Sequence, residues 1–150
     1  MKSLFPLLSI VIIFFSFCGE KQPDKSGAAR SPVNPEDSLF HEVMRGHDEG
    51  MAKIGRIKKY SGRLKSVIDS INGNSQADKS VLPAIQRVKD SLDAANASMF
   101  TWMDGFKADT LTGMSARMGY LEDQKASVTV VRDRIQNSLR LYDSLDKQYK

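Results

Sequence analysis

Met44, His47 and Met51 have the side-chain types and the spacing that binding of a soft metal requires. Residues three and four positions apart lie on one face of a helix. Cu(I) accepts thioether and neutral imidazole ligands, and a His together with a Met can hold haem iron from two sides. With Met99 or Met103 from a second segment, these side chains form a candidate copper or haem site, or a Met-lined pocket for a small apolar ligand.

The same residues also suit ordinary core packing. Methionine fills irregular gaps and contacts aromatic rings such as Trp102 and Phe106, and His47 can serve as a core polar residue that sets helix register. Gly46 and Gly50 lie beside this face, where two glycines either permit close approach of a helix or ligand or only weaken the turn. We therefore expect packing without a cofactor, and copper or haem binding is the alternative.

No catalytic constellation accompanies these residues. The chain has two His and one Cys among 150 residues, and a single Cys excludes an intramolecular disulfide and a Cys-cluster zinc site. There is no G-x-S-x-G motif to place a nucleophile on a turn and no Glu-x-x-His motif of the kind that di-iron bundles use. We predict that the protein is not an enzyme.

The N-terminal residues have the layout of a secretory signal peptide. Lys2 gives a positive start, and an apolar run from Leu4 to Phe15 follows. That run is shorter than the about 20 residues that a membrane-spanning helix needs. Cys18, the lone Cys, ends the segment and resembles the acylated Cys of a bacterial lipoprotein signal, although Phe17 is larger than the residue usual before it. This resemblance implies that Cys18 is the site of lipid attachment.

The N-terminal boundaries follow from this assignment. Residues 1–17 are the predicted signal peptide, and residues 18–35 are the lipidated Cys and a Pro-containing flexible linker. Several acyl chains such as palmitate on one Cys hold a protein stably on a membrane. We predict a lipid-anchored protein of a Gram-negative cell envelope, at the outer membrane and in contact with the periplasm, where it meets no nucleic acid.

Residues 36–150 carry a helical pattern in three segments. Apolar residues recur at steps of three and four over about 38–71, 79–107 and 114–149, which predicts three helices. Their similar lengths and short connections predict an all-α fold, an antiparallel up-down-up three-helix bundle. The β-branched run at 128–131 is short and sits inside the third helical pattern.

Antiparallel packing places the start of the first helix beside the end of the second and the start of the third. All six methionines outside the signal peptide fall at this Met-rich end, which comprises Met44, Met51, Met99, Met103, Met114 and Met118. We expect any metal, apolar ligand or partner helix to bind there, since flexible Met surfaces accept varied partners.

A basic segment lies further along the first helix, and it contains Lys53, Arg56, Lys58, Lys59, Arg63 and Lys65. These residues spread around the helix, which is typical of a solvated face, and the alternative is contact with anionic lipid or an acidic partner. Only Tyr60 is interleaved, so nucleic-acid binding is not predicted. Glu49 and Lys53 are spaced as an i, i+4 ion pair.

Three stretches of the chain resemble a group of small bacterial lipoproteins of unknown function, often labelled viral A-type inclusion proteins. They are HDEGMAKI at 47–54, ASMFTWMDGF at 97–106 and YLEDQKASV at 120–128. The resemblance implies a secreted, lipid-anchored, all-helical protein with no assigned reaction. The sequence therefore predicts a non-enzymatic envelope lipoprotein with a structural or protein-interaction role, an envelope protein as partner, and self-association.

Overall fold

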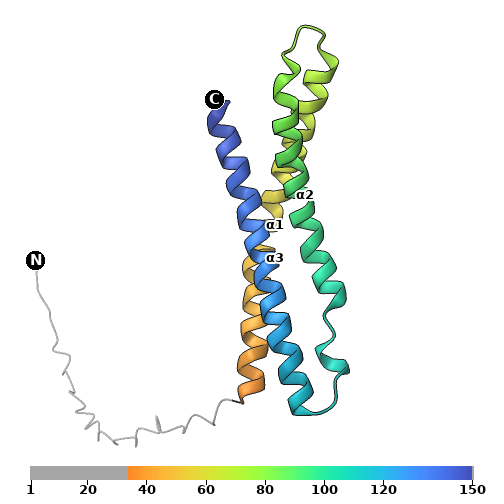
Figure 1. Cartoon of the computed structure of the whole chain (residues 1–150), viewed down its shortest axis with the longest axis vertical. Coiled ribbons are helices and arrows are strands. Elements are labelled where there is room, and N and C mark those ends of the chain that lie inside the picture. Colours follow the sequence, from red (N-terminus) through yellow and green to blue (C-terminus); the bar gives the residue numbers. More distant parts are fainter. Residues whose placement is uncertain (1–33, 150) are drawn as a thin grey trace, which may run out of the picture. The chain divides into compact units, whose positions relative to one another are not determined.

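The computed structural model describes residues 34–149, which form three long helices joined by two short connections (Figure 1). The helices are α1 (Pro35–Gly73), α2 (Leu82–Gly105) and α3 (Met114–Gln148), with 3-10 helices η1 (Lys79–Val81) and η2 (Ala108–Thr110) in the connections. Each long helix packs against the other two. The predicted all-α three-helix bundle is confirmed.

The predicted signal peptide, Cys18 and most of the linker lie outside the described residues. Within residues 34–149, no helix combines the length and the hydrophobicity needed to cross a membrane.

Contacts between the helices establish their directions. Between α1 and α2 the residue numbers run in opposite directions, because Phe40 packs on Phe106 while Ser61 bonds to Asp93. Between α1 and α3 the numbers rise together, in the ion pairs Glu36–Arg117, Glu42–Lys125, Glu49–Arg132 and Arg63–Asp146. The order is therefore up-down-up, as the sequence predicted.

Capping residues explain where the helices begin. Helix α1 starts at Pro35, three residues before the predicted start, because Asn34 Oδ1 accepts a hydrogen bond from the backbone N–H of Glu36 at 3.1 Å. Asp78 accepts from the backbone N–H of Ser80 at 2.8 Å and begins η1. Helix α2 therefore starts after a 3-10 turn, later than predicted.

The connection between α2 and α3 is held by a tyrosine from α3. The hydroxyl of Tyr120 accepts from the backbone N–H of Lys107 at 2.6 Å and donates to the carbonyl of Gly105 at 3.5 Å. Gly113, just before α3, has a φ of 93°, a conformation that side-chain-bearing residues rarely adopt. These groups fix the end of α2 against the start of α3.

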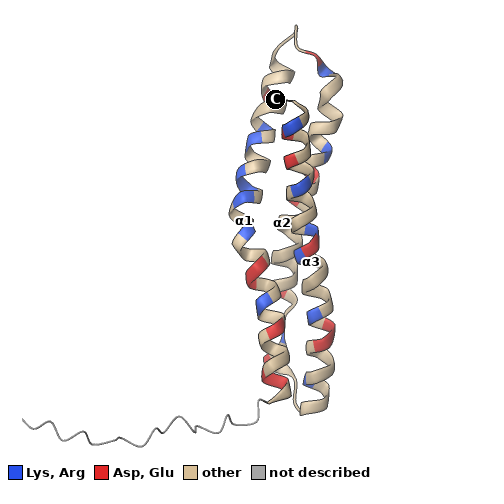
Figure 2. Ribbon diagram, turned by 90° about the vertical axis from the view of Figure 1, so that its left-hand side faces the viewer, with Lys and Arg blue, Asp and Glu red and all other residues tan. Residues whose placement is uncertain are grey.

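One hydrophobic core runs along the bundle. The turn between α1 and α2 extends beyond the end of α3 (Figures 1 and 2), so the last turns of α1 pack on α2 alone. Ile68 and Ile71 near this end of α1 are half-buried, and Val67, which lines a pocket with the last residues of α3, is exposed. The largest fully buried apolar side chains are Ile57, Leu92, Met99, Ile135, Val43 and Val128.

The charged residues on α1 are divided along the helix. Figure 2 shows basic residues gathered on the half of α1 near its turn with α2, and acidic residues nearer its start. Glu49 pairs with Arg132 on α3 at 3.4 Å, and Lys53 donates to the Glu49 backbone carbonyl at 2.7 Å. The predicted Glu49–Lys53 ion pair is therefore wrong, because the Glu49 carboxylate is directed toward α3.

Candidate functional site

The structure places the five candidate ligands of the Met-rich end at very different depths. Met44 and Met51 are half-buried on α1, on either side of His47, whose side chain is 16% exposed. On α2, Met99 is fully buried while Met103 is 37% exposed. The α1 residues thus share a face as predicted, and the two α2 methionines do not share an environment.

The imidazole of His47 is oriented by two neighbours. Its Nδ1 lies 2.9 Å from Oδ1 of Asp48, and its ring centroid lies 5.8 Å from that of Trp102. A carboxylate on one ring nitrogen leaves Nε2 as the nitrogen for a ligand, an arrangement also found at metal-bound histidines. His41, the other His, is exposed and contacts Phe40 edge to face.

The glycine pair on α1 permits close packing of the other two helices. A Cβ on Gly50 would lie 2.3 Å from Cε of Met99, and a Cβ on Gly46 would lie 2.9 Å from Cγ1 of Val128. Both distances are shorter than real Cβ contacts. Of the two alternatives for these glycines, close approach of a helix is therefore correct, and Met99 fills the space beside Gly50.

Aromatic rings close the same end of the bundle. Phe40, Trp102 and Tyr120 surround Phe106, with ring centroids 6.2, 5.1 and 5.9 Å from it. The indole N–H of Trp102 is buried and has no hydrogen-bond acceptor among the described residues. The three helices are thus joined here by packing between aromatic rings, whereas the sequence predicted contacts of methionine with Trp102 and Phe106.

A Met-rich surface covers the joint between α1 and α2. We define it by Met44 and Met51 on α1 and by Phe100 and Met103 on α2. Phe100 and Met103 are each 37% exposed, and they lie one turn apart. Lys58 covers part of the Phe100 ring, with its Nζ 5.2 Å from the ring centroid. This surface presents adaptable apolar groups beside a cation.

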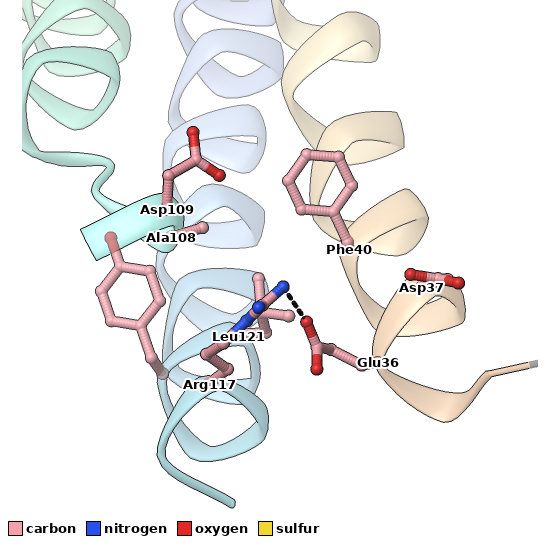
Figure 3. A pocket seen from close by; sticks show the side chains of 8 residues that line it. Glu36, Asp37, Phe40, Ala108, Asp109, Arg117 and Leu121 are labelled. Atoms are coloured by element: carbon pink, nitrogen blue, oxygen red, sulfur yellow. Dashed lines mark ion pairs between the residues drawn. The ribbon is translucent and has the colours of Figure 1, made fainter. Parts of the chain in front are cut away.

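A polar cleft of about 210 Å³ lies between the start of α1, η2 and the start of α3 (Figure 3). Glu36 is almost fully buried and forms an ion pair with Arg117. Phe40 and Asp109 flank this pair, as Figure 3 shows. No local pattern in the sequence predicts this cleft, because its residues come from three separate segments, each with ordinary helix-end composition.

The carboxylates of the described residues do not form a metal site by themselves. Among residues 34–149, no three His, Cys, Asp or Glu side chains gather as metal binding requires. A metal at the Met-rich end would have to use thioethers with His47. Cys18, the predicted lipid attachment site, lies outside the described residues.

A polar bridge joins α1 to α2 further along the bundle. Ser61 Oγ donates to Asp93 Oδ1 at 2.5 Å, and Lys89 Nζ pairs with Asp93 Oδ2 at 2.6 Å. Partial burial raises the pKa of Asp93, but the hydrogen bonds from Lys89 and Ser61 outweigh it and leave that pKa below its usual value. The pKa of Lys89 is raised by the same bond.

Comparisons with protein-family models, with curated proteins and with solved structures found no match for this chain. The described residues themselves define a long three-helix bundle with an apolar, Met-rich surface on one side of its α1–α2 joint.

Proposed function

We propose that the protein is a non-enzymatic lipoprotein of a Gram-negative cell envelope that acts by contact with another envelope protein. Acyl chains on Cys18 would anchor it to the outer membrane, and residues 18–35 would connect the anchor to the helical bundle. The motivating sequence features are the apolar run, the lone Cys at its end and the Pro-containing stretch that follows.

The observation that carries the interaction role is the exposure of Phe100 and Met103 on the Met-rich surface. Met44 and Met51 on α1 are half-buried, and Lys58 of α1 contacts Phe100 across the joint between the two helices. Flexible thioethers and a partly covered aromatic ring fit an apolar helix or segment of a partner. The exposed cation of Lys58 beside Phe100 favours a partner that carries an acidic group near its apolar contact.

The anchor is tested by metabolic labelling in a Gram-negative host. Labelled palmitate should enter the wild-type chain and should not enter Cys18→Ala, and the wild-type chain should sediment with membranes. Unlabelled wild-type protein that is released in soluble form would exclude the lipoprotein assignment.

The interaction surface is tested separately, by a photo-cross-linking amino acid placed at Phe100 in the full chain. Val67 is the matched control position, because it has the same 37% exposure at the far end of the bundle. We expect a discrete adduct with an envelope protein at position 100 and none at position 67. If both positions form the adduct equally, or neither forms it, the Met-rich surface is not the interaction surface.

Copper or haem binding is a second candidate function. The contact between His47 and Asp48 favours it, since this contact orients the ring and leaves Nε2 as the nitrogen for a ligand, on the helix face that Met44 and Met51 share. The full chain would be titrated with Cu(I) and with haem. Stoichiometric uptake that is lost in His47→Leu and kept in His41→Leu supports the site, and no uptake by the wild-type chain rejects it.

A further inference from the structure

A shallow groove of about 630 Å³ runs between α2 and α3, away from the Met-rich surface. Small side chains make up much of its lining, which also includes the buried Trp102. The residues that line it include Ala94, Ser98 and Thr101 on α2 and Ser127, Val130 and Arg134 on α3. Small residues allow another helix to approach closely, and a groove this open leaves room for one.

Helix α3 carries exposed apolar and charged side chains in this groove and on both sides of it along the helix. Val130, which lines the groove, is 59% exposed, and Leu141, further along α3, is 49% exposed. Asp123 and Arg134 are exposed, and neither forms an ion pair or hydrogen bond with another described residue. On the α1 side of the same helix, by contrast, Lys125 and Arg132 are both paired with acidic residues of α1.

These residues form one stripe along α3, because their spacing follows the helical repeat. In order, the stripe contains Ala116, Asp123, Ser127, Val130, Arg134 and Leu141. Its midpoint lies between Ser127 and Val130. Each stripe residue before the midpoint has a counterpart at the same distance along the helix after it. A two-fold axis through the midpoint would therefore pair each stripe residue with another stripe residue of a second, antiparallel copy.

The resulting pairs are complementary in size and in charge. Asp123 of one copy would face Arg134 of the other, and the small Ser127 would face the exposed Val130. One step further out, the small Ala116 would face the exposed Leu141. Opposite charges that meet across an interface set its register and orientation, and a large side chain opposite a small one packs without a void.

From these relations we propose that the protein forms an antiparallel homodimer in which α3 of one copy lies along the α2–α3 groove of the other. A two-fold contact uses the same patch on both copies, so it must be self-complementary, and this stripe meets that condition. The proposal concerns a different side of the bundle from the Met-rich surface and does not rest on the envelope assignment.

The available area agrees with a specific dimer. From Ala116 to Leu141 the stripe is about 38 Å long at about 1.5 Å per residue, and a face two helices wide spans about 20 Å. These dimensions correspond to about 750 Å² on each copy. Stable, specific interfaces bury roughly 800 Å² per partner.

Charge reversal provides the first test, with the full chain in mild detergent and sedimentation velocity as the readout. Asp123→Arg and Arg134→Asp should each raise the dimer Kd about 10-fold or more, because symmetry creates two like-charged pairs. The double variant Asp123→Arg with Arg134→Asp restores opposite charges across the axis, so its Kd should return to within about threefold of wild type.

Asp143→Arg is the matched control, since Asp143 is exposed on another face of α3, and its Kd should stay within about twofold of wild type. A chain that stays monomeric at millimolar concentration overturns the proposal. So does a double variant that dimerises no better than the single variants. Circular dichroism of each variant confirms that the helices are retained.

Cross-linking tests the antiparallel geometry in a full chain that carries Cys18→Ser. With a short bismaleimide, Val130→Cys should cross-link to itself near the axis. Ala116→Cys alone should not, because the two copies of residue 116 would be about 38 Å apart. Mixing Ala116→Cys with Leu141→Cys should yield a heterodimer. Efficient self-cross-linking of Ala116→Cys would indicate a parallel dimer and would overturn the proposal.

Discussion

Cε of Met99 lies against the backbone of Gly50, in the space that a side chain at residue 50 would occupy. A Cβ on Gly50 would lie 2.3 Å from that methyl group. Met99 is fully buried, so the group has little room to withdraw. A similar relationship joins Gly46 to Val128, at 2.9 Å. The two glycines therefore determine how closely α2 and α3 approach α1.

Substitution of Gly46 should destabilise the bundle although alanine favours helices. Gly46→Ala gains about 1 kcal/mol of helix propensity, but the new methyl overlaps the stiff, branched side chain of Val128, and overpacking costs about 1–3 kcal/mol. We expect a net loss of about 1 kcal/mol in urea unfolding. Gly62→Ala is the control, with no atom within 4 Å of the new methyl, and it should stabilise by about 0.5–1 kcal/mol. Stabilisation by both variants would contradict the close contact.

Gly50 and Met99 should behave as a coupled pair. Gly50→Ala gains about 1 kcal/mol of helix propensity but overpacks the end of Met99 by about 1–3 kcal/mol, so its net cost should be about 0–2 kcal/mol. Met99→Ala should cost about 2–5 kcal/mol by leaving a cavity. In the double variant the new methyl at position 50 enters the space that the Met99 side chain vacates. The free energy of unfolding that the double variant loses should therefore be smaller than the sum of the two single losses, by about 1 kcal/mol or more. A double-mutant cycle of urea unfolding measures this difference. Simple additivity would mean that the two residues do not contact in solution.

Arg117 should matter more for stability than Lys125, although both pair with acidic residues of α1. Its partner Glu36 is almost fully buried, whereas Glu42, the partner of Lys125, is in contact with solvent. Arg117→Ala leaves a buried carboxylate without its counter-charge, which should cost about 1–3 kcal/mol. Lys125→Ala should cost less, because water replaces the lost partner of an exposed carboxylate. Urea unfolding at pH 7 compares the two, and equal losses would indicate that Glu36 is solvated in solution.

The bridge at Asp93 predicts a dependence of stability on acid pH. The pKa of Asp93 is lowered in the folded chain, so the unfolded chain binds a proton more readily. The bridge therefore contributes stability above the ordinary Asp pKa, and this contribution is lost as the pH falls through the lower folded pKa. We expect Asp93→Asn to lower stability by about 0.5–1 kcal/mol at pH 7 and to differ little from wild type near pH 2.

Ser61→Ala serves as the control for this pH dependence. It removes one of the hydrogen bonds to Asp93 and keeps Lys89. Its loss of stability between pH 7 and pH 2 should therefore fall between those of the wild type and Asp93→Asn. Thermal unfolding at several pH values measures all three chains. A constant difference between wild type and Asp93→Asn at every pH would exclude the proton linkage.

Local signals were sufficient to predict the helices and their order. The apolar steps of three and four established three segments, and the run at 128–131 is helical because its β-branched residues sit within that repeat. The helix starts were less predictable. Asn34 caps α1 and moves its start to Pro35, which places Asp37 in the first turn.

Residues of the candidate site were predictable in type and not in environment. The spacing placed Met44, His47 and Met51 on one face, and this arrangement is present. The spacing could not show that Met99 is enclosed beside Gly50 while Met103 is partly exposed, because burial depends on where α1 and α3 lie around α2. For the same reason, Glu49 was predicted to pair along its own helix and instead pairs across to Arg132.

The sequence alone thus determined the all-α class, the number of helices and the gathering of methionines at one end. Hydrophobic periodicity and chain direction are properties of the chain itself. Only the tertiary structure decided which faces are covered. It left Val130, Leu141, Asp123 and Arg134 exposed on one stripe of α3, and it closed the opposite side of that helix with ion pairs. Exposure and pairing depend on the packing of neighbouring helices, which no single segment encodes.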